Sequence, residues 1–260
     1  FFQAEDGIRG RRPSRGLGDV YKRQLYEAVG VIAASERNAA ALFGAGSTFY
    51  SAGGSSQCVK AMLYLALQAT GRRTILAARN VHKAFVHAAA LLDFTVEWIW
   101  PEPYQLLRCD VTAERLEEAL RRMKEPPAAV YLTSPDYLGH VQPIEELAPV
   151  CHRYGIPLLV DNAHGAYLHF LPVPCHPLDQ GADLCCDSAH KTLPVLTGGA
   201  YLHMARPEEM GGEIAARQAL ALFGSTSPSY LILQSLDLCN RYLAGEFPVS
   251  YTHLTLPTKL

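Results

Sequence analysis

The sequence has little of several features that would mark a specialised protein. Charged residues make up only 18% of its 260 residues, and the formal net charge is −2. This balance lacks the basic excess that is typical of nucleic-acid-binding proteins. No apolar run approaches the roughly 20 residues that a membrane-spanning helix needs. We therefore expect neither a nucleic-acid partner nor a membrane location.

The cysteines also lack the spacing of a known motif. The seven cysteines are scattered along the chain, and no pair has the C-x-x-C spacing of a zinc or redox motif. This usage is typical of reduced thiols in a cytoplasmic protein. We therefore expect a cytoplasmic location and no bound metal.

The two ends of the sequence differ from its middle. The chain begins with Phe1 rather than methionine, and residues 1–24 and 248–260 resemble translated adapter sequence rather than native protein. We expect a fragment whose native part, residues 25–247, forms one large α/β domain, and we expect the natural protein to continue beyond both ends.

Short apolar runs alternate with amphipathic stretches through the native part. Strands are predicted at residues 47–51, 74–78, 95–100, 128–133, 157–161, 182–187 and 199–204. Helices are predicted at residues 57–70, 112–124, 143–155, 213–223 and 229–244. This alternation predicts a mostly parallel seven-stranded sheet with helices on both faces. Only a loop joins the last two strands, so we expect one of them to be antiparallel.

Polar, glycine and ionisable residues follow five of the predicted strands. Ligands of open α/β sheets bind at this edge, where the carboxyl ends of the strands meet. The segment "GGSSQ" (53–57) is a glycine turn that enters a helix, where N–H groups and two hydroxyls could bind a phosphate. An ordinary helix cap is the alternative interpretation of this segment.

Four ionisable residues fall at the same edge. Asp161 ends an apolar strand, so we expect it to be buried and to need a partner, as a ligand acid or in a structural ion pair. Lys191 lies on a loop between two strands, and it is either a nucleophilic amine in a low-dielectric pocket or an exposed loop lysine. His82 and His164 could each be a buried structural histidine. A phosphate site, an acid and a lysine together indicate pyridoxal phosphate, which needs a Schiff-base lysine and an acid at its ring nitrogen.

A family resemblance rests on two segments of this edge. "DNAHGAY" (161–167) and "DSAHKTLPVLT" (187–197) resemble the pyridoxal-phosphate attachment region of the ornithine/lysine/arginine decarboxylase family, and the similarity runs from about Leu42 to Leu243. The resemblance implies the large domain of pyridoxal-phosphate fold type I, a homodimer or larger homo-oligomer, and decarboxylation of a basic amino acid. We expect the family's small C-terminal domain to be absent from this chain.

The resemblance also implies a role for each candidate residue. Lys191 would form the Schiff base, Asp161 would hold the ring nitrogen, and His82 would stack on the ring. His164 would be the fourth catalytic residue and a further cofactor contact. Hydroxyls and a histidine would bind the phosphate, a "TSP" turn would lie beside the cofactor, and the "STSPSY" segment would reach the phosphate of a neighbouring subunit. These further cofactor-binding positions are Ser55, Ser56, Thr133, Ser134, Ser188, His190, Ser225, Thr226 and Ser227.

Three positions depart from the family pattern. Asp136 stands where the family usually has threonine, Asn162 stands where glutamate is common, and "TGGA" (197–200) replaces a glutamine. Asp136 could pair with the distal cation of a substrate or cap its own turn. The departures leave two alternatives open. One is another fold type I enzyme, such as an aminotransferase, a carbon–sulfur lyase or an aldolase, and the other is a catalytically silent homologue.

Overall fold

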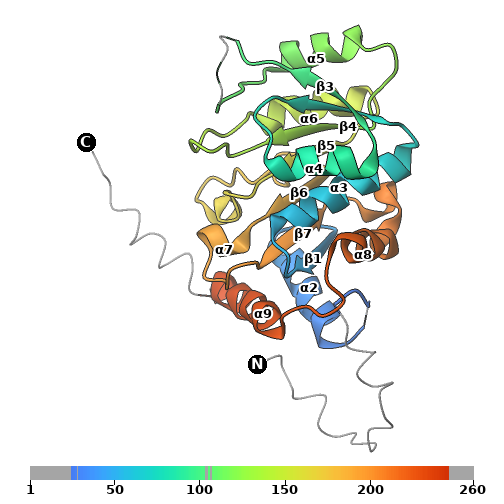
Figure 1. The fold of residues 1–260 in the computed structure, drawn as a ribbon. Helices are drawn as coiled ribbons and strands as arrows, with labels where there is room; N and C mark the ends of the chain where they lie inside the picture. Colours follow the sequence, from blue (N-terminus) through green and yellow to red (C-terminus); the bar gives the residue numbers. More distant parts are fainter. Residues whose placement is uncertain (1–24, 28, 103–104, 106, 246–260) are drawn as a thin grey trace, which may run out of the picture.

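A seven-stranded sheet forms the centre of the molecule, in a computed structural model that describes residues 25–27, 29–102, 105 and 107–245 (Figure 1). Its strand order is β1-β7-β6-β5-β4-β2-β3. The strands are β1 (Ser47–Ser51), β2 (Thr74–Ala78), β3 (Thr95–Ile99), β4 (Ala129–Thr133), β5 (Leu158–Asp161), β6 (Leu184–Asp187) and β7 (Ala200–Met204). All seven predicted strands are therefore confirmed, with ends that shift by no more than two residues.

Strand direction follows from the lengths of the connections. Strands β3, β2, β4, β5 and β6 pair in parallel, whereas β7 is antiparallel to both β6 and β1. The connection from β6 to β7 contains only the short helix α7 (Ala189–Thr192). Because it carries no crossover helix, β7 returns alongside β6 in the opposite direction, as the sequence predicts.

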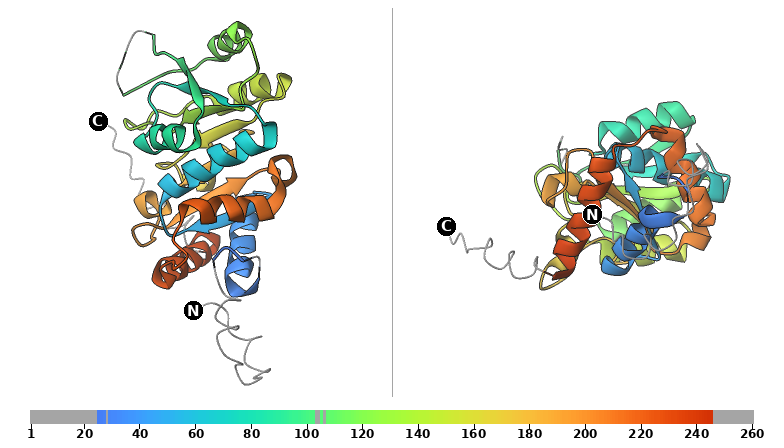
Figure 2. Two further views of the ribbon diagram at one scale, coloured as in Figure 1. Left: turned by 45° about the vertical axis from the view of Figure 1, so that its right-hand side comes forward. Right: turned by 90° about the horizontal axis from the view of Figure 1, so that it is seen from below.

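Helices cover both faces of the sheet, as Figures 1 and 2 show from three sides. Helices α3, α4 and α8 pack on one face, and α5, α6, α2 and α9 pack on the other. Their bounds are α2 (Gly30–Leu42), α3 (Ser55–Thr70), α4 (Lys83–Leu92), α5 (Ala113–Arg122), α6 (Ile144–Arg153), α8 (Gly212–Phe223) and α9 (Tyr230–Gly245), with short 3₁₀ turns at Leu168–Phe170 and Pro207–Met210. None of the described helices is long and apolar enough to cross a membrane.

Three of the described α-helices were not predicted, namely α2, α4 and the four-residue α7. The α2 sequence is rich in alanine, and the α4 sequence "KAFVHAAALL" is almost entirely apolar after its first residue, so neither has a clear polar face. A pattern without two distinct faces gives only a weak signal for a surface helix. By contrast, α5 carries a clear signal, and its predicted cap is confirmed because Thr112 Oγ1 accepts a hydrogen bond from the Arg115 amide at 3.3 Å.

The interior of the sheet is apolar on both faces, and this determines where polar chemistry can lie. Along β4, Ala129 and Tyr131 face α3 and α4, whereas Val130 and Leu132 face α5 and α6. Strands that are buried on both faces leave little room for polar side chains except at their ends. In β5 and β6 the last residues are Asp161 and Asp187, and both are almost completely buried.

Candidate active site

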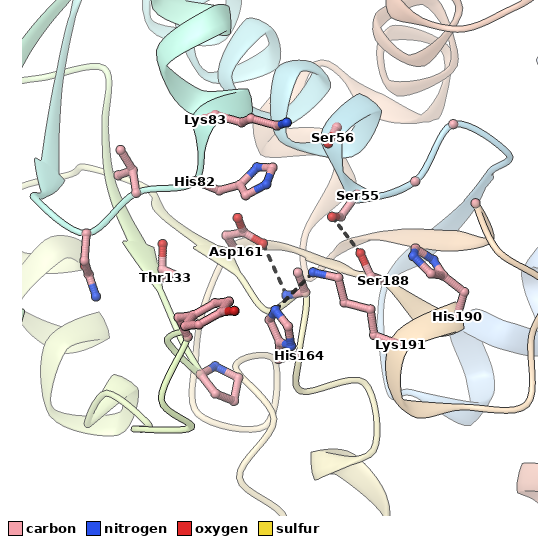
Figure 3. Close-up of a pocket in the computed structure, with 18 of the residues that line it drawn as sticks. Ser55, Ser56, His82, Lys83, Thr133, Asp161, His164, Ser188, His190 and Lys191 are labelled. Carbon is pink, nitrogen blue, oxygen red and sulfur yellow. Dashed lines mark hydrogen bonds between the residues drawn. The ribbon is translucent and has the colours of Figure 1, made fainter. Parts of the chain in front are cut away.

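A cavity of about 640 Å³ opens at the edge of the sheet where the parallel strands end (Figure 3). Its wall is built from the ends of the parallel strands and the segments that follow β1, β2, β3, β4, β5 and β6, together with residues that precede β7. Nine of the residues predicted from the sequence line it: Ser55, Ser56, His82, Thr133, Asp161, His164, Ser188, His190 and Lys191. The topology therefore brings together residues that are up to 136 positions apart, from Ser55 to Lys191.

Four predicted residues do not line the cavity. Ser134 is buried, and its Oγ accepts a hydrogen bond from the Gln142 amide at 3.0 Å. Its hydroxyl therefore has a partner that is not part of the cavity wall. Ser225, Thr226 and Ser227 are exposed in the turn between α8 and α9. Their predicted contact with a neighbouring subunit stays a prediction.

Hydroxyl groups and a helix end form one side of the cavity. Helix α3 begins at Ser55, and its N-cap residue Gly54 has a φ of 75°, a left-handed conformation that favours glycine. The Ser188 hydroxyl donates to the Ser55 hydroxyl at 2.7 Å. The positive end of the α3 dipole and these two hydroxyls make this side suitable for an anion such as a phosphate.

Asp161 is the acid of the cavity. It is 2% exposed, and its carboxylate accepts hydrogen bonds from the Ala163 amide and the Tyr131 hydroxyl, each at 3.2 Å. Burial raises the pKa of Asp161, although the charge of His82 opposes this shift. A cation placed in the cavity beside Asp161 would favour its ionised form.

Lys191 lies on the short helix α7 rather than on a loop. It lines the cavity and its side chain is exposed, so it combines a cavity position with the exposure that the alternative interpretation expected. Its Nζ lies 3.0 Å from Nε2 of His164. Burial and the charge of Lys191 lower the pKa of His164, which favours a neutral imidazole that accepts a hydrogen bond from the ammonium.

The two candidate histidines are exposed at the cavity, so neither is a buried structural histidine. His82 is the N-cap residue of α4, and its Nδ1 accepts a hydrogen bond from the Ala84 amide at 3.2 Å. This contact holds the imidazole above Asp161 in Figure 3. Partial burial lowers the pKa of His82, while the charge of Asp161 opposes that shift.

Sequence reasoning missed several lining residues, among them Arg79, Asn80, Lys83, Tyr137 and Thr197. The Arg79 guanidinium lies over the rings of Trp98 and Trp100, at 5.1 and 5.4 Å from their centroids. The signal was present, since three of these residues lie in "RNVHK" beside His82 and a fourth, Tyr137, lies close to the "TSP" turn. Only the folded chain shows that their side chains reach the cavity.

Thr133 has the least satisfied hydroxyl of the cavity wall. Its Oγ1 is buried and has no hydrogen-bond partner among the described residues. An unpaired buried hydroxyl is costly, so a cavity residue of this kind is expected to find its partner on a ligand.

Asp136 does not line the cavity. It is 2% exposed, and its Oδ1 accepts hydrogen bonds from the amides of Leu138 at 2.9 Å and His140 at 3.0 Å. These contacts support the interpretation that Asp136 caps its turn. They leave the alternative, a partner for the distal cation of a substrate, without structural support.

A second polar cluster lies outside the cavity and was not predicted. His176, Asp187 and His203 are completely buried, and their potential ligand atoms lie within 4.8 Å of one another. Their positions in the sequence have no metal-ligand spacing, so the sequence pattern gives no indication of the cluster.

The fold defines a class, that of proteins with the α/β large domain of fold type I. Lysine decarboxylase A from Pseudomonas aeruginosa has the same fold, with a TM-score of 0.72 and 21% identity over 88% of this chain and 33% of that one. More particularly, the chain belongs to the Orn/Lys/Arg decarboxylase family, whose major-domain model matches residues 16–256. This match extends past both predicted boundaries, 25 and 247, which stay a prediction.

Two curated relatives support the same assignment. The arginine decarboxylase of Halalkalibacterium halodurans is 31% identical over 236 residues, which are 88% of this chain and 46% of that protein. The uncharacterised protein YaaO of Bacillus subtilis is 36% identical over 224 residues, which are 84% of this chain and 45% of that protein. The chain thus spans less than half the length of these relatives.

Proposed function

We propose that this chain is the cofactor-binding domain of a pyridoxal-phosphate-dependent decarboxylase that acts on lysine, arginine or ornithine, with Lys191 as the residue that holds the cofactor covalently. The observation that carries the proposal is the joint presence of Lys191, Asp161 and the Ser55–Ser188 hydroxyl pair in one cavity. Family membership supports the reaction and the substrate class.

The residues of the cavity fit pyridoxal phosphate. The end of α3 with Ser55 and Ser188 would bind the phosphate, Asp161 would face the ring nitrogen, and Lys191 would reach the aldehyde. Two local features also fit, namely the unpaired hydroxyl of Thr133 and the raised pKa of Asp161. A hydrogen-bonding and cationic ligand would satisfy both.

Each ionisable residue then has a defined task. Pyridoxal phosphate, when bound, supplies an electron sink for the electron pair left on the substrate Cα. Asp161 would hold a proton at the ring nitrogen. His82, fixed by its contact with the Ala84 amide, would lie against the ring. His164 orients the Lys191 amine through the 3.0 Å contact between their nitrogens.

The substrate class rests on the family rather than on the cavity wall. Among the described lining residues Asp161 is the only carboxylate, whereas Arg79, Lys83 and Lys191 are cationic. Asp161 faces the cofactor in this proposal, so the wall offers no second acid for the distal cation of a basic amino acid. We infer that this group is recognised by a part of the full-length protein, or of a second copy, that lies outside the described residues.

A shared site in a cytoplasmic homodimer is part of the proposal. Ser225, Thr226 and Ser227 are exposed and hydroxyl-rich, which suits a contact with the phosphate of a neighbouring subunit. Mixing a Lys191→Ala subunit with a subunit that carries alanine at these three positions should restore activity. Heterodimers that form without regaining activity would contradict the shared site.

The covalent attachment is tested by borohydride reduction of the complete protein with pyridoxal phosphate, followed by peptide mass spectrometry. We expect the adduct on the peptide that contains Lys191. Lys83→Ala is the matched control, because Lys83 also lines the cavity, and this variant should keep the adduct while Lys191→Ala loses it. An adduct on Lys83 would contradict the assignment.

The reaction is tested separately, by release of labelled CO₂ from carboxyl-labelled lysine, arginine and ornithine. We expect the complete protein to release CO₂ from at least one of them. If it releases none but transfers amino groups to a keto acid, an aminotransferase replaces the proposed decarboxylase. Absence of any cofactor absorbance would instead indicate a catalytically silent homologue.

A further inference from the structure

The buried cluster outside the cavity is organised around Asp187, the last residue of β6. Its Oδ2 accepts hydrogen bonds from Nε2 of His176 at 3.1 Å and from Nε2 of His203 at 3.2 Å. Its Oδ1 accepts a hydrogen bond from Nδ2 of Asn162 at 2.6 Å. All four side chains are completely buried, so Asp187 is held by three donors from three other segments of the chain.

The cluster joins the neighbours of two residues of the candidate site. Asn162 directly follows Asp161, and Asp187 directly precedes Ser188. In the parallel register of β5 and β6, Asp161 pairs with Cys186, and the Asn162 amide donates to the Cys186 carbonyl at 3.0 Å. The 2.6 Å contact between Asn162 and Asp187 therefore extends the connection between the two strands one step beyond their last backbone pair.

The directions of the hydrogen bonds show what the cluster is built to hold. Nδ1 of His176 accepts from the Leu178 amide at 3.3 Å, so Nε2 carries the proton and donates to Asp187. His203 is fixed on its other side by a 2.8 Å contact between its Nδ1 and Oγ1 of Thr48 on β1. A metal ion would need a bare Nε2 on His176. This arrangement instead satisfies a buried carboxylate, which would otherwise be very costly.

We propose that Asp187, through Asn162, is a positioning residue that holds the end of β6 against the end of β5, and so fixes Ser188 and Lys191 relative to Asp161. This inference rests on the proposed function. Pyridoxal phosphate is a rigid ring that would be held at its phosphate by one strand end and at its nitrogen by the other. Small displacements of ligand-holding groups have large effects on binding and catalysis. We therefore expect a contact that fixes the two strand ends relative to each other.

The test uses Asn162→Leu in the complete protein, because leucine has nearly the same shape as asparagine but cannot donate to Asp187. The matched control is Glu36→Gln, which alters another buried ion pair, Glu36 with Arg217 at 2.8 Å, away from the cavity. Both variants are expected to lower the melting temperature. Only Asn162→Leu should raise the Kd for pyridoxal phosphate, by about tenfold or more, as partners of ligand-holding residues commonly do.

Two further measurements separate positioning from a general loss of stability. The visible circular dichroism band of the bound cofactor reports its orientation, and it should change in Asn162→Leu but not in Glu36→Gln. Hydrogen exchange without cofactor should become faster in the peptide covering residues 186–195 only in Asn162→Leu. His203→Gln, which keeps a donor toward Asp187, should retain more cofactor affinity than His203→Leu.

Several outcomes would overturn the inference. One is an unchanged Kd and dichroism band in Asn162→Leu, and another is an equal change in Glu36→Gln. Stoichiometric zinc in the purified protein that is lost in His203→Leu would show that the cluster is a metal site instead. A wild-type protein that binds no pyridoxal phosphate would overturn the proposed function, and hydrogen exchange would then decide whether the strand ends are locked.

Discussion

Asp161 and Asp187 are the last residues of two adjacent strands, yet their surroundings differ in kind. Asp161 borders the cavity and receives hydrogen bonds from a backbone amide and a tyrosine hydroxyl. Asp187 does not line this cavity, and it receives hydrogen bonds from two imidazoles and an amide side chain. Both carboxylates are almost completely buried, so burial alone does not distinguish them.

The pKa shifts of the two carboxyl groups run in opposite directions. Burial raises the pKa of Asp161, and its neighbours compensate this only in part. Burial also acts to raise the pKa of Asp187, but the electrostatic interaction with His176 and the hydrogen bonds from His176 and His203 outweigh it and hold this pKa well below its usual range. The acid with the raised pKa borders the cavity, where a cationic ligand would favour its ionised form, and the acid with the lowered pKa belongs to the scaffold.

The largest expected effect comes from breaking the satisfied cluster. Asp187→Leu keeps the shape of the side chain but leaves two buried imidazole N–H groups and the Asn162 amide without their acceptor. We expect a loss of roughly 3–5 kcal/mol in the free energy of unfolding, measured by urea denaturation without cofactor. The same replacement at Asp161 leaves weaker donors unpaired, namely a hydroxyl and an amide at 3.2 Å and a thiol at 3.7 Å, and we expect a loss of about 1–3 kcal/mol. Equal losses at both positions would contradict the comparison.

The second effect is on the reaction. In Asp161→Asn the ring nitrogen would no longer be held protonated, whereas the phosphate contacts of Ser55 and Ser188 would remain. We expect the turnover of the complete protein to fall about a hundredfold or more while bound cofactor is retained. Turnover with saturating substrate and the cofactor content of the purified variant are the measurements. A variant with near-wild-type turnover would remove Asp161 from the proposed role.

The third effect is on the pH dependence of stability. The folded-state pKa of Asp161 is raised, so the folded state binds more protons and its stability falls as pH rises above the ordinary aspartate pKa of about 3.9. The folded-state pKa of Asp187 is lowered, so the stability it contributes is present above that value and is lost as pH falls below it.

The two opposite pH dependences can be measured as unfolding free energies without cofactor. The useful range is from about pH 3 to about pH 6, because it brackets the ordinary aspartate pKa. The advantage of the wild type over Asp187→Asn should shrink toward the acidic end. Relative to Asp161→Asn, the wild type should instead lose stability toward the neutral end. The same sign for both variants would show that the two environments do not differ as described.

The smallest expected effect concerns Thr133, whose buried hydroxyl has no partner among the described residues. Thr133→Val keeps the shape and removes the unpaired group, so we expect the apo-protein to gain up to about 1 kcal/mol of unfolding free energy. Because the hydroxyl would pair with the cofactor, affinity for pyridoxal phosphate should fall in the same variant. Loss of stability together with unchanged affinity would place this hydroxyl outside the ligand site.

Much of this protein could be predicted from local pattern. Short apolar runs bounded by turns located every strand, because a sheet that is buried on both faces demands apolar residues throughout. The ends of those strands then predicted where a cavity lies, and the segments around Asp161 and Lys191 predicted pyridoxal phosphate as its ligand, which stays a prediction. Local signals were weakest for α4, where an almost entirely apolar sequence hides the helical period.

Other features depend on contacts between distant segments, and only the tertiary structure decided them. The orientation of Ser134 toward the Gln142 amide and the exposure of Lys191 on α7 follow from packing that no neighbouring residue specifies. The cluster around Asp187 gathers five segments, with members as far apart as Thr48 and His203. Hydrogen bonds of this kind leave no period or spacing in a sequence, because they form only after the strands have paired.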